Sequence, residues 1–221
     1  MRFGYGKMLQ EIFYTLFSKG DIIKNLTICV ACADRKKMLE DYFLPAFLKI
    51  AKNIDVQLVM AVPINEETSI KTLLNDNGVK NHRIIGLTTS FSRSHYLNHT
   101  LAASKNQAVF ICDVDIALPV NFIQLFKKYV SKHTAWFPIC VLNNEADKFD
   151  RFYEEGTGLV GFINKNETLR FDGSIKTWGN EDWIFLYTLY QNKIYPIRSF
   201  EKSMVHHYHL TVEKLNYKKK W

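Results

Sequence analysis

The sequence predicts an α/β domain built on a largely parallel β-sheet with helices on both faces. Two observations lead to this prediction. Apolar runs of strand length alternate along the chain with segments of helical periodicity, which is the order of a sheet whose strands are connected by helices. The 221 residues, 47% hydrophobic and 23% charged, are enough for one globular domain with a sizeable core.

The predicted elements follow one another in order. A helix is expected near the N-terminus because Met8, Ile12 and Leu16 fall on one helical face. Continuous apolar runs predict strands, at 26–33, 56–62, 83–87, 108–112, 135–142 and 158–163. Helical spacing predicts the remaining elements, at 35–53, 66–76, 92–105, 119–133 and 181–193. Pro45 should kink or break its helix, whereas Pro119 stands in a first turn, where its missing N–H costs nothing.

We divide the chain into an N-terminal helix and lead-in (1–25), the α/β domain (26–210) and a basic tail (211–221). The segment 143–157 is polar, charged and long for a plain connection, which is typical of a functional loop. No apolar run approaches the roughly 20 residues of a membrane-spanning helix. The N-terminal segment also lacks the apolar stretch of a secretory signal, so we expect a cytoplasmic protein.

The net charge of +7 favours an anionic partner, such as a phosphorylated small molecule, anionic lipid or nucleic acid. Part of this charge lies in the tail, which is either a solvated terminus or a peripheral contact with the membrane surface through its lysines and Trp221. Cys112 and Cys140 lie in apolar, strand-like runs and are predicted to be buried, reduced thiols. Cys29-x-x-Cys32 resembles a redox motif or half of a zinc site, but no second pair of zinc ligands is evident at suitable spacing.

Two aspartates, Asp113 and Asp115, follow directly after the predicted strand 108–112. Alternation along an extended backbone would place both carboxylates on one face, where they need a positive group between them. Ligands of α/β sheets bind beyond the carboxyl ends of strands, and carboxylate oxygens suit Mg²⁺ or Mn²⁺ shared with substrate phosphates. The pair therefore indicates metal or phosphate chemistry, with a plain turn as the alternative.

Two more clusters carry candidate functional groups. Glu181 and Asp182 open a predicted helix, where the dipole favours carboxylates, and the neighbouring tryptophans Trp178 and Trp183 offer flat surfaces for sugar rings or bases. The alternative is an ordinary acidic helix start.

Three histidines, His206, His207 and His209, form the other cluster. Such a group suggests a metal or phosphate site, and an imidazole beside aspartates would favour Mn²⁺ over Mg²⁺.

Together these segments resemble a known family. The chain resembles the catalytic domains of β-1,4-galactosyltransferases, and also chondroitin-type N-acetylgalactosaminyltransferases and related family 2 enzymes with the GT-A fold. The resemblance runs from about residue 26 to 209 and rests on "CADRKKMLEDYFLP", "FSRSHYLNHTLAAS", "FICDVDIALP", "GLVGFINKNETLRFDG", "WGNEDW" and the histidine cluster, in that order. It implies a single GT-A domain that binds a nucleotide-sugar.

The resemblance also implies roles on the donor side. Asp113 and Asp115 match the family's Asp-x-Asp, whose second aspartate binds the metal that holds the nucleotide-sugar diphosphate. The remaining donor-site residues are expected to be Arg35 near the nucleotide, Arg93 and Asn98 beside the diphosphate and ribose, and Trp178 with Gly179 along the sugar. The metal-binding histidine stays open: one alignment favours His207, and another favours His206 with His209 as its companion.

On the acceptor side, the resemblance implies that Asp182 is the general base and that Glu181 contacts acceptor or donor sugar. The expected reaction is inverting transfer of a sugar of the Gal, GalNAc or GlcNAc type from a UDP-sugar to a saccharide or lipid-linked saccharide, with Mn²⁺ or Mg²⁺ as cofactor. We expect no nucleic acid partner. Asn180 and Trp183 depart from the family pattern, so the sugar is not fixed.

Two other functions fit part of the pattern. A metal-dependent nucleotidyltransferase also pairs carboxylates over an α/β sheet, but it would release pyrophosphate rather than UDP. A basic α/β module that binds an anionic membrane or nucleic acid would bind in a salt-dependent way, indifferent to the two aspartates.

Overall fold

The computed structural model describes residues 23–208 apart from 53, 155–157, 166–167 and 176–179, and it has the predicted α/β architecture. Its strands are β1 (Leu26–Ala31), β2 (Val56–Pro63), β3 (His82–Leu87), β4 (Ala108–Ile111), β5 (Ile116–Ala117), β6 (Thr134–Asn143), β7 (Phe149–Phe152), β8 (Val160–Ile163) and β9 (Tyr195–His206). Its helices are α2 (Lys36–Met38), α3 (Leu44–Ala51), α4 (Ile64–Asp76), α5 (Arg93–Ala103), α6 (Phe122–Tyr129) and α7 (Glu181–Gln191). The expected N-terminal helix and basic tail lie outside the described residues.

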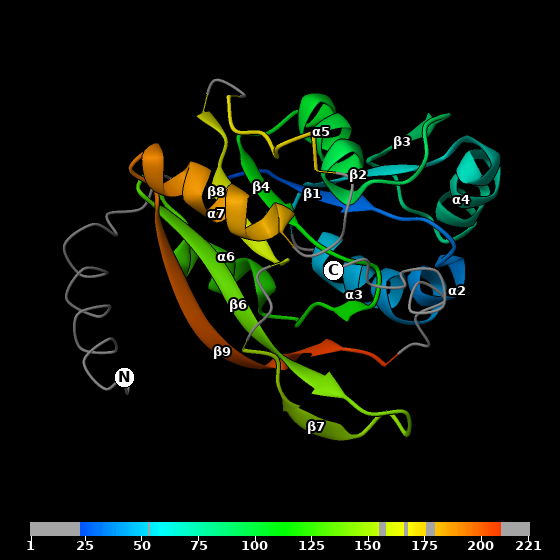
Figure 1. Ribbon diagram of the computed structural model, residues 1–221. Coiled ribbons are helices and arrows are strands. Elements are labelled where there is room, and N and C mark those ends of the chain that lie inside the picture. Colours follow the sequence, from blue (N-terminus) through cyan, green and yellow to red (C-terminus); the bar gives the residue numbers. More distant parts are fainter. Residues whose placement is uncertain (1–22, 53, 155–157, 166–167, 176–179, 209–221) are drawn as a thin grey trace, which may run out of the picture.

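One sheet contains all the strands of the described residues, in the order β3-β2-β1-β4-β8-β6-β9-β5, with β7 paired to β6 (Figure 1). The first four strands are mutually parallel, as predicted. In the other half, only β6 and β9 are parallel, while β4–β8, β6–β8, β6–β7 and β5–β9 are antiparallel. The sheet is therefore mixed, and the prediction of a largely parallel sheet is wrong for this half.

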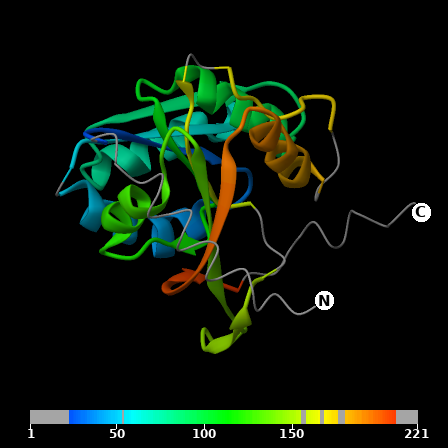
Figure 2. The same ribbon diagram turned by 90° about the vertical axis from the view of Figure 1, so that its left-hand side faces the viewer.

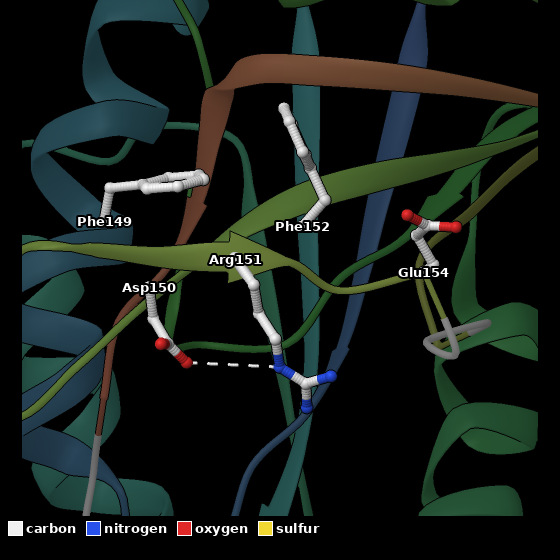
Figure 3. A pocket seen from close by; sticks show the side chains of 5 residues that line it. All are labelled: Phe149, Asp150, Arg151, Phe152 and Glu154. Atoms are coloured by element: carbon white, nitrogen blue, oxygen red, sulfur yellow. Dashed lines mark ion pairs between the residues drawn. The ribbon is translucent and has the colours of Figure 1, made fainter.

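Two antiparallel ladders, β4–β8 and β6–β8, join predicted strands, because an apolar run does not give the direction of a strand. The other two involve β9 and β7, which carry no apolar run. β7 lies inside the segment 143–157 that was predicted as a loop, and it is largely exposed, with its side chains around a surface pocket (Figure 3). β9 follows the last predicted helix and is only partly buried along its length. Both are held by pairing with β6, whose middle is buried. Figure 2 shows β6 and β9 side by side, with β7 at the far end of the pair.

The core fills both faces of the sheet, because the parallel strands β1, β2 and β4 are buried on both sides. On one face, Phe110 of β4 contacts Phe122 of α6, with ring centroids 4.8 Å apart, within a cluster that also takes in α3 and α4. On the other face, Phe185 of α7 stacks on Phe171 at 4.1 Å and joins α5. None of the described helices has the length and apolar character needed to cross a membrane.

Pro45 disturbs its helix as predicted, through a wider turn. A π-helical segment, Leu39–Phe43, lies between α2 and α3, and the Leu44 N–H donates to the carbonyl of Leu39, five residues back. A proline has no N–H, and its ring would collide with the carbonyl four residues earlier in a regular helix. The π turn, a recurrent local widening of helices, removes that conflict.

The strand order creates a switch point between β1 and β4, at the edge of the sheet formed by the carboxyl ends of these strands. β1 lies between β2 and β4, and the chain passes from β3 back across to β4. The backbone N–H of Cys112, just after β4, donates to the carbonyl of Cys29 in β1, so β4 is still paired with β1 where it ends. Ligands of doubly wound sheets bind outside the carboxyl ends of strands at such a point. Both the segment with Arg35 and the segment with Asp113 begin there.

Candidate active site

Arg93, the first residue of α5, joins three separate parts of the chain at this edge. Its guanidinium donates to Asp113 Oδ1 (3.1 Å), to Asp182 Oδ1 (2.6 Å) and to the carbonyl oxygen of Gly158 (2.8 Å). Glu181 Oε1 lies 3.8 Å away, and the Arg93 side chain is only 10% exposed. Burial lowers the pKa of Arg93, but the three carboxylates raise it by more than burial lowers it. The pKa of Arg93 therefore lies above the ordinary value. Arg93 is therefore a permanent cation between the two acidic motifs.

Asp115 has a different set of partners. Its Oδ2 accepts a hydrogen bond from Arg35 Nη1 at 2.6 Å and lies 3.5 Å from His206 Nε2. The antiparallel pairing of β5 and β9 sets Ile116 opposite His206 and so brings the imidazole to the carboxylate. Burial lowers the pKa of His206, while Asp115 and Asp113 raise it more, so that its pKa lies above the ordinary value.

The alternation predicted that the two aspartates of the Asp-x-Asp pair would share one face of an extended strand. The structure does not have this arrangement. The chain turns at this point, with the Ile116 N–H bonded to the Asp113 carbonyl, so one carboxylate faces Arg93 and the other faces Arg35. Burial raises the pKa of Asp113, Arg93 lowers it, and Asp115 and Asp182 raise it, with a net shift upward. Each aspartate thus has its own arginine.

Seven predicted residues come together here: Arg35, Arg93, Asp113, Asp115, Glu181, Asp182 and His206. His207 points elsewhere, because its ring stacks on Tyr42 at 3.7 Å and its Nδ1 contacts Asp147 Oδ1 at 2.7 Å. The side-chain amide of Asn98 holds the backbone of Phe171 through both of its polar atoms. Trp178, Gly179 and His209 lie outside the described residues.

Sequence reasoning missed Gly158 as a residue of the site. A Cβ at this position would lie 3.2 Å from Arg93 Nη2, 3.4 Å from Asp182 Oδ2 and 3.5 Å from Asp113 Oδ2. A larger side chain would enter the cluster, so the glycine leaves room for Arg93 to reach both acidic motifs. Its carbonyl contributes through the backbone, for which no side-chain pattern in the sequence gives a signal.

Two serines beside Arg93 were also missed. The hydroxyls of Ser92 and Ser94 both donate to the carbonyl of Ile175, each at 3.0 Å. They therefore attach the start of α5 to the segment that ends at Ile175, six residues before Glu181.

The four cysteines are free and buried, which confirms the prediction for Cys112 and Cys140. Cys29 belongs to the core on one face of the sheet and Cys32 to the core on the other. Burial raises the pKa of each of these thiols to about 12. The Cys-x-x-Cys spacing therefore does not form half of a zinc site.

Within the described part of the chain, no three side chains of His, Cys, Asp or Glu converge as a ready-made metal site. Asp115 and His206 do converge, and a carboxylate with an imidazole suits Mn²⁺. Divalent cations of this kind often take only one or two protein carboxylates and complete their coordination with phosphate oxygens and water. These two residues, with Asp113 nearby, fit a cation that is bound together with a diphosphate.

No protein-family model matches the chain, but solved structures share its fold. Mannosyltransferase PcManGT from Pyrobaculum calidifontis, in complex with GDP-Man and Mn²⁺, matches with a TM-score of 0.64 and 13% identity over 94% of this chain and 66% of that one. S. aureus TarS, in complex with UDP-GlcNAc, matches with a TM-score of 0.63 and 12% identity over 84% of this chain. The chain spans only 59% of that TarS structure.

Two further neighbours bear on the alternatives. A Drosophila β-1,4-galactosyltransferase 7 mutant, in complex with manganese, UDP-Gal and xylobiose, has a TM-score of 0.56 and 12% identity over 88% of this chain and 80% of that one. The inositol-1-phosphate CTP transferase from T. maritima has a TM-score of 0.57 and 13% identity over 85% and 90%. The fold alone therefore does not separate sugar transfer from nucleotidyl transfer. The chain has the GT-A fold, which it shares with nucleotide-sugar transferases.

Proposed function

We propose that this protein is an inverting, metal-dependent glycosyltransferase that moves a sugar from a UDP-sugar to a hydroxyl of a saccharide or lipid-linked saccharide. The observation that carries the proposal is the placement of Arg93, which contacts both the Asp113 and the Asp182 motifs. A donor-binding acidic pair and a candidate base are thereby held on either side of one cation. Nucleotidyl transfer has no need of a base placed to deprotonate a sugar hydroxyl.

The donor side is built to hold a diphosphate. Departure of the nucleoside diphosphate builds negative charge on its oxygens, and Arg35 and Arg93 are the cations at this edge that can stabilise it. Asp115 and His206, with Asp113, would hold Mn²⁺ or Mg²⁺, which when bound supplies further positive charge to the leaving group. Between the two candidate histidines, the geometry favours His206 over His207.

The acceptor side needs a base, because a sugar hydroxyl is a weak nucleophile until its proton is removed. Asp182 is partly buried at the start of α7, where Arg93 Nη1 lies 2.6 Å from its Oδ1 and fixes the position of the carboxylate that would accept the proton. Glu181 lies beside it, with its side chain 2% exposed and 3.8 Å from Arg93, and would help to position that cation. A single base with no nucleophilic partner predicts direct displacement at the anomeric carbon, and hence inversion.

The test is a nucleotide-release assay with Mn²⁺, a panel of UDP-sugars carrying Gal, GalNAc or GlcNAc, and candidate saccharide acceptors. Acceptor-dependent release of UDP and a product of inverted configuration are expected. A parallel reaction with UTP or CTP and sugar phosphates measures pyrophosphate. Pyrophosphate release without UDP release would replace the proposal with nucleotidyl transfer. Absence of both UDP release and UDP binding would exclude the donor class.

A further inference from the structure

The outward face of α7 is lined with large aromatic side chains. Trp183, Tyr187 and Tyr190 are 55%, 61% and 59% exposed, and they are spaced four and three residues apart, so they lie along one side of the helix. Tyr195, at the start of β9, continues the row, with its ring 5.7 Å from that of Tyr190. We call these four residues the aromatic track. Figure 1 shows α7 (orange) on the outside of the sheet, in front of β8.

An exposed helical face normally carries polar or charged side chains. The inward face of α7 is already occupied, because Phe185 and Leu189 are buried in the core. Its outward face adds Ile184, 38% exposed, to the aromatic track. The helix is therefore apolar on nearly all sides, although it borders solvent, and contiguous exposed apolar surface of this kind marks an interaction site.

The composition of the track points to a neutral sugar chain rather than a lipid surface. Helices that lie on membranes are rich in Lys and Arg on the polar face, and α7 contains neither over its whole length. Tyrosine and tryptophan offer a flat, electron-rich ring face together with a polar tip. A pyranose ring offers the matching surface, with C–H groups on its faces and hydroxyls around its edge.

The track also has the right position and spacing. It begins at Trp183, one residue after the candidate base Asp182, so the first end of the track and the site lie at the same end of α7. The rise of an α-helix separates successive track residues on α7 by about 6 Å and about 4.5 Å. Each step is comparable to the length of one sugar residue in a chain.

We propose that the aromatic track is the binding platform for an extended, neutral oligosaccharide acceptor whose terminal hydroxyl faces Asp182. This inference rests on the proposed glycosyltransferase function and specifies its acceptor: a chain of at least three sugar residues rather than a monosaccharide.

The test compares the full-length protein with Tyr187→Ala, Tyr190→Ala and the double variant. A printed array of neutral oligosaccharides of one to six residues identifies ligands, and calorimetry measures the tightest one. Binding is expected only for chains of three or more residues, with losses of about fivefold for each single variant and about 25-fold for the double variant. The Tyr187→Phe, Tyr190→Phe double variant keeps both rings and loses only the hydroxyls, so it should bind much more tightly than the double alanine variant. Phe200→Ala removes an equally exposed aromatic side chain of β9 and should also bind normally.

Mn²⁺-dependent binding of UDP, measured on the same proteins, tests the proposed function separately. If UDP binds but oligosaccharide binding is absent, or is unchanged in the double alanine variant, the platform is wrong and the donor assignment stands. If oligosaccharides bind through the track but UDP does not, the platform stands without the transferase. Two other results would overturn the platform, because each would show a different occupant of the track: flotation with lipid vesicles that the double variant loses, or a dimer that the double variant dissociates.

Discussion

At the scale of single residues, the site is organised by two arginines that hold four carboxylates. Arg93 reaches Asp113, Glu181 and Asp182, and Arg35 reaches Asp115. All of these contacts are at least half-buried, where ion pairs are less screened than at the surface. The consequence is that neighbouring carboxylates should have separable functions, one on the donor side and one on the acceptor side.

Substitution of Asp182 and Asp115 tests this division. Asp182→Asn keeps a hydrogen-bond acceptor for Arg93 but cannot take a proton, so transfer should fall by about 10²–10⁴-fold, with Mn²⁺-dependent UDP binding retained. Asp115→Asn should lose both UDP binding and transfer. Calorimetry and the UDP-release assay measure the two properties. Turnover by Asp182→Asn at the parent rate would contradict the base assignment.

The pairing of His206 with Asp115 predicts a pH dependence of stability in the absence of metal. Because the pKa of His206 is raised in the folded protein, its ion pair stabilises fully below the unfolded pKa of about 6.5 and loses that effect as the pH rises through the folded pKa. Urea unfolding in EDTA should show that His206→Gln costs most at low pH and progressively less at high pH. His82→Gln is the control, because the His82 ring contacts a backbone carbonyl, that of Val79, rather than a carboxylate. A cost for His206→Gln that is the same at every pH would exclude the ion pair.

At the scale of elements, the sequence predicts those whose burial is one-sided or complete and misses those held by their neighbours. β1, β2 and β4 are continuous apolar runs because both faces are covered, and α4 and α5 show helical spacing. β9 contains Pro196 and several polar residues, among them Lys202. Its strand conformation comes from pairing along β6 rather than from an apolar pattern in its own sequence. No local rule could have identified it, because the partner strand ends more than 50 residues earlier.

The packing of β8 against α6 gives a prediction at this scale. A Cβ on Gly161 would lie 2.8 Å from Phe126 Cε2 and 3.1 Å from Val130 Cγ2, and Phe126 is 1% exposed and has little room to move. Gly161→Ala should therefore destabilise the fold by about 1–3 kcal/mol in urea unfolding. Gly173→Ala is the matched control, since its nearest neighbour would be an ordinary contact at 3.8 Å. Equal effects of the two substitutions would show that β8 and α6 are not packed this closely.

At the scale of the whole molecule, the site exists only when distant segments meet. Arg35 and Asp115 are 80 residues apart, and Arg93 and Asp182 are 89 apart. The sequence identified these residues because each follows a strand or opens a helix, and because their motifs resemble a known family. It could not predict which arginine pairs with which carboxylate, because that depends on the turn after β4 and on the space left by Gly158.

A ligand that spans these segments should stabilise the whole fold. Mn²⁺ and UDP together, at about 100 times their dissociation constant, should add about 2.7 kcal/mol and raise the melting temperature by about 5–10 °C. Thermal unfolding monitored by circular dichroism measures the shift. Asp115→Asn should show no shift, and Mn²⁺ with AMP should give a smaller one. An unchanged melting temperature for the parent protein with Mn²⁺ and UDP would contradict the donor assignment.

The two arginines of the site, Arg35 and Arg93, do not balance the charge of the four carboxylates around them. With all groups ionised and His206 neutral, the four carboxylates outnumber the two guanidiniums and leave two negative charges at the carboxyl edge of the sheet. A diphosphate approaching alone would meet net repulsion, despite the overall positive charge of the chain. One divalent cation would neutralise the excess and convert the edge into an anion receptor. The positive charge of the protein as a whole therefore attracts the donor diphosphate, whereas the negative charge of the site repels it. A bound cation would remove the repulsion.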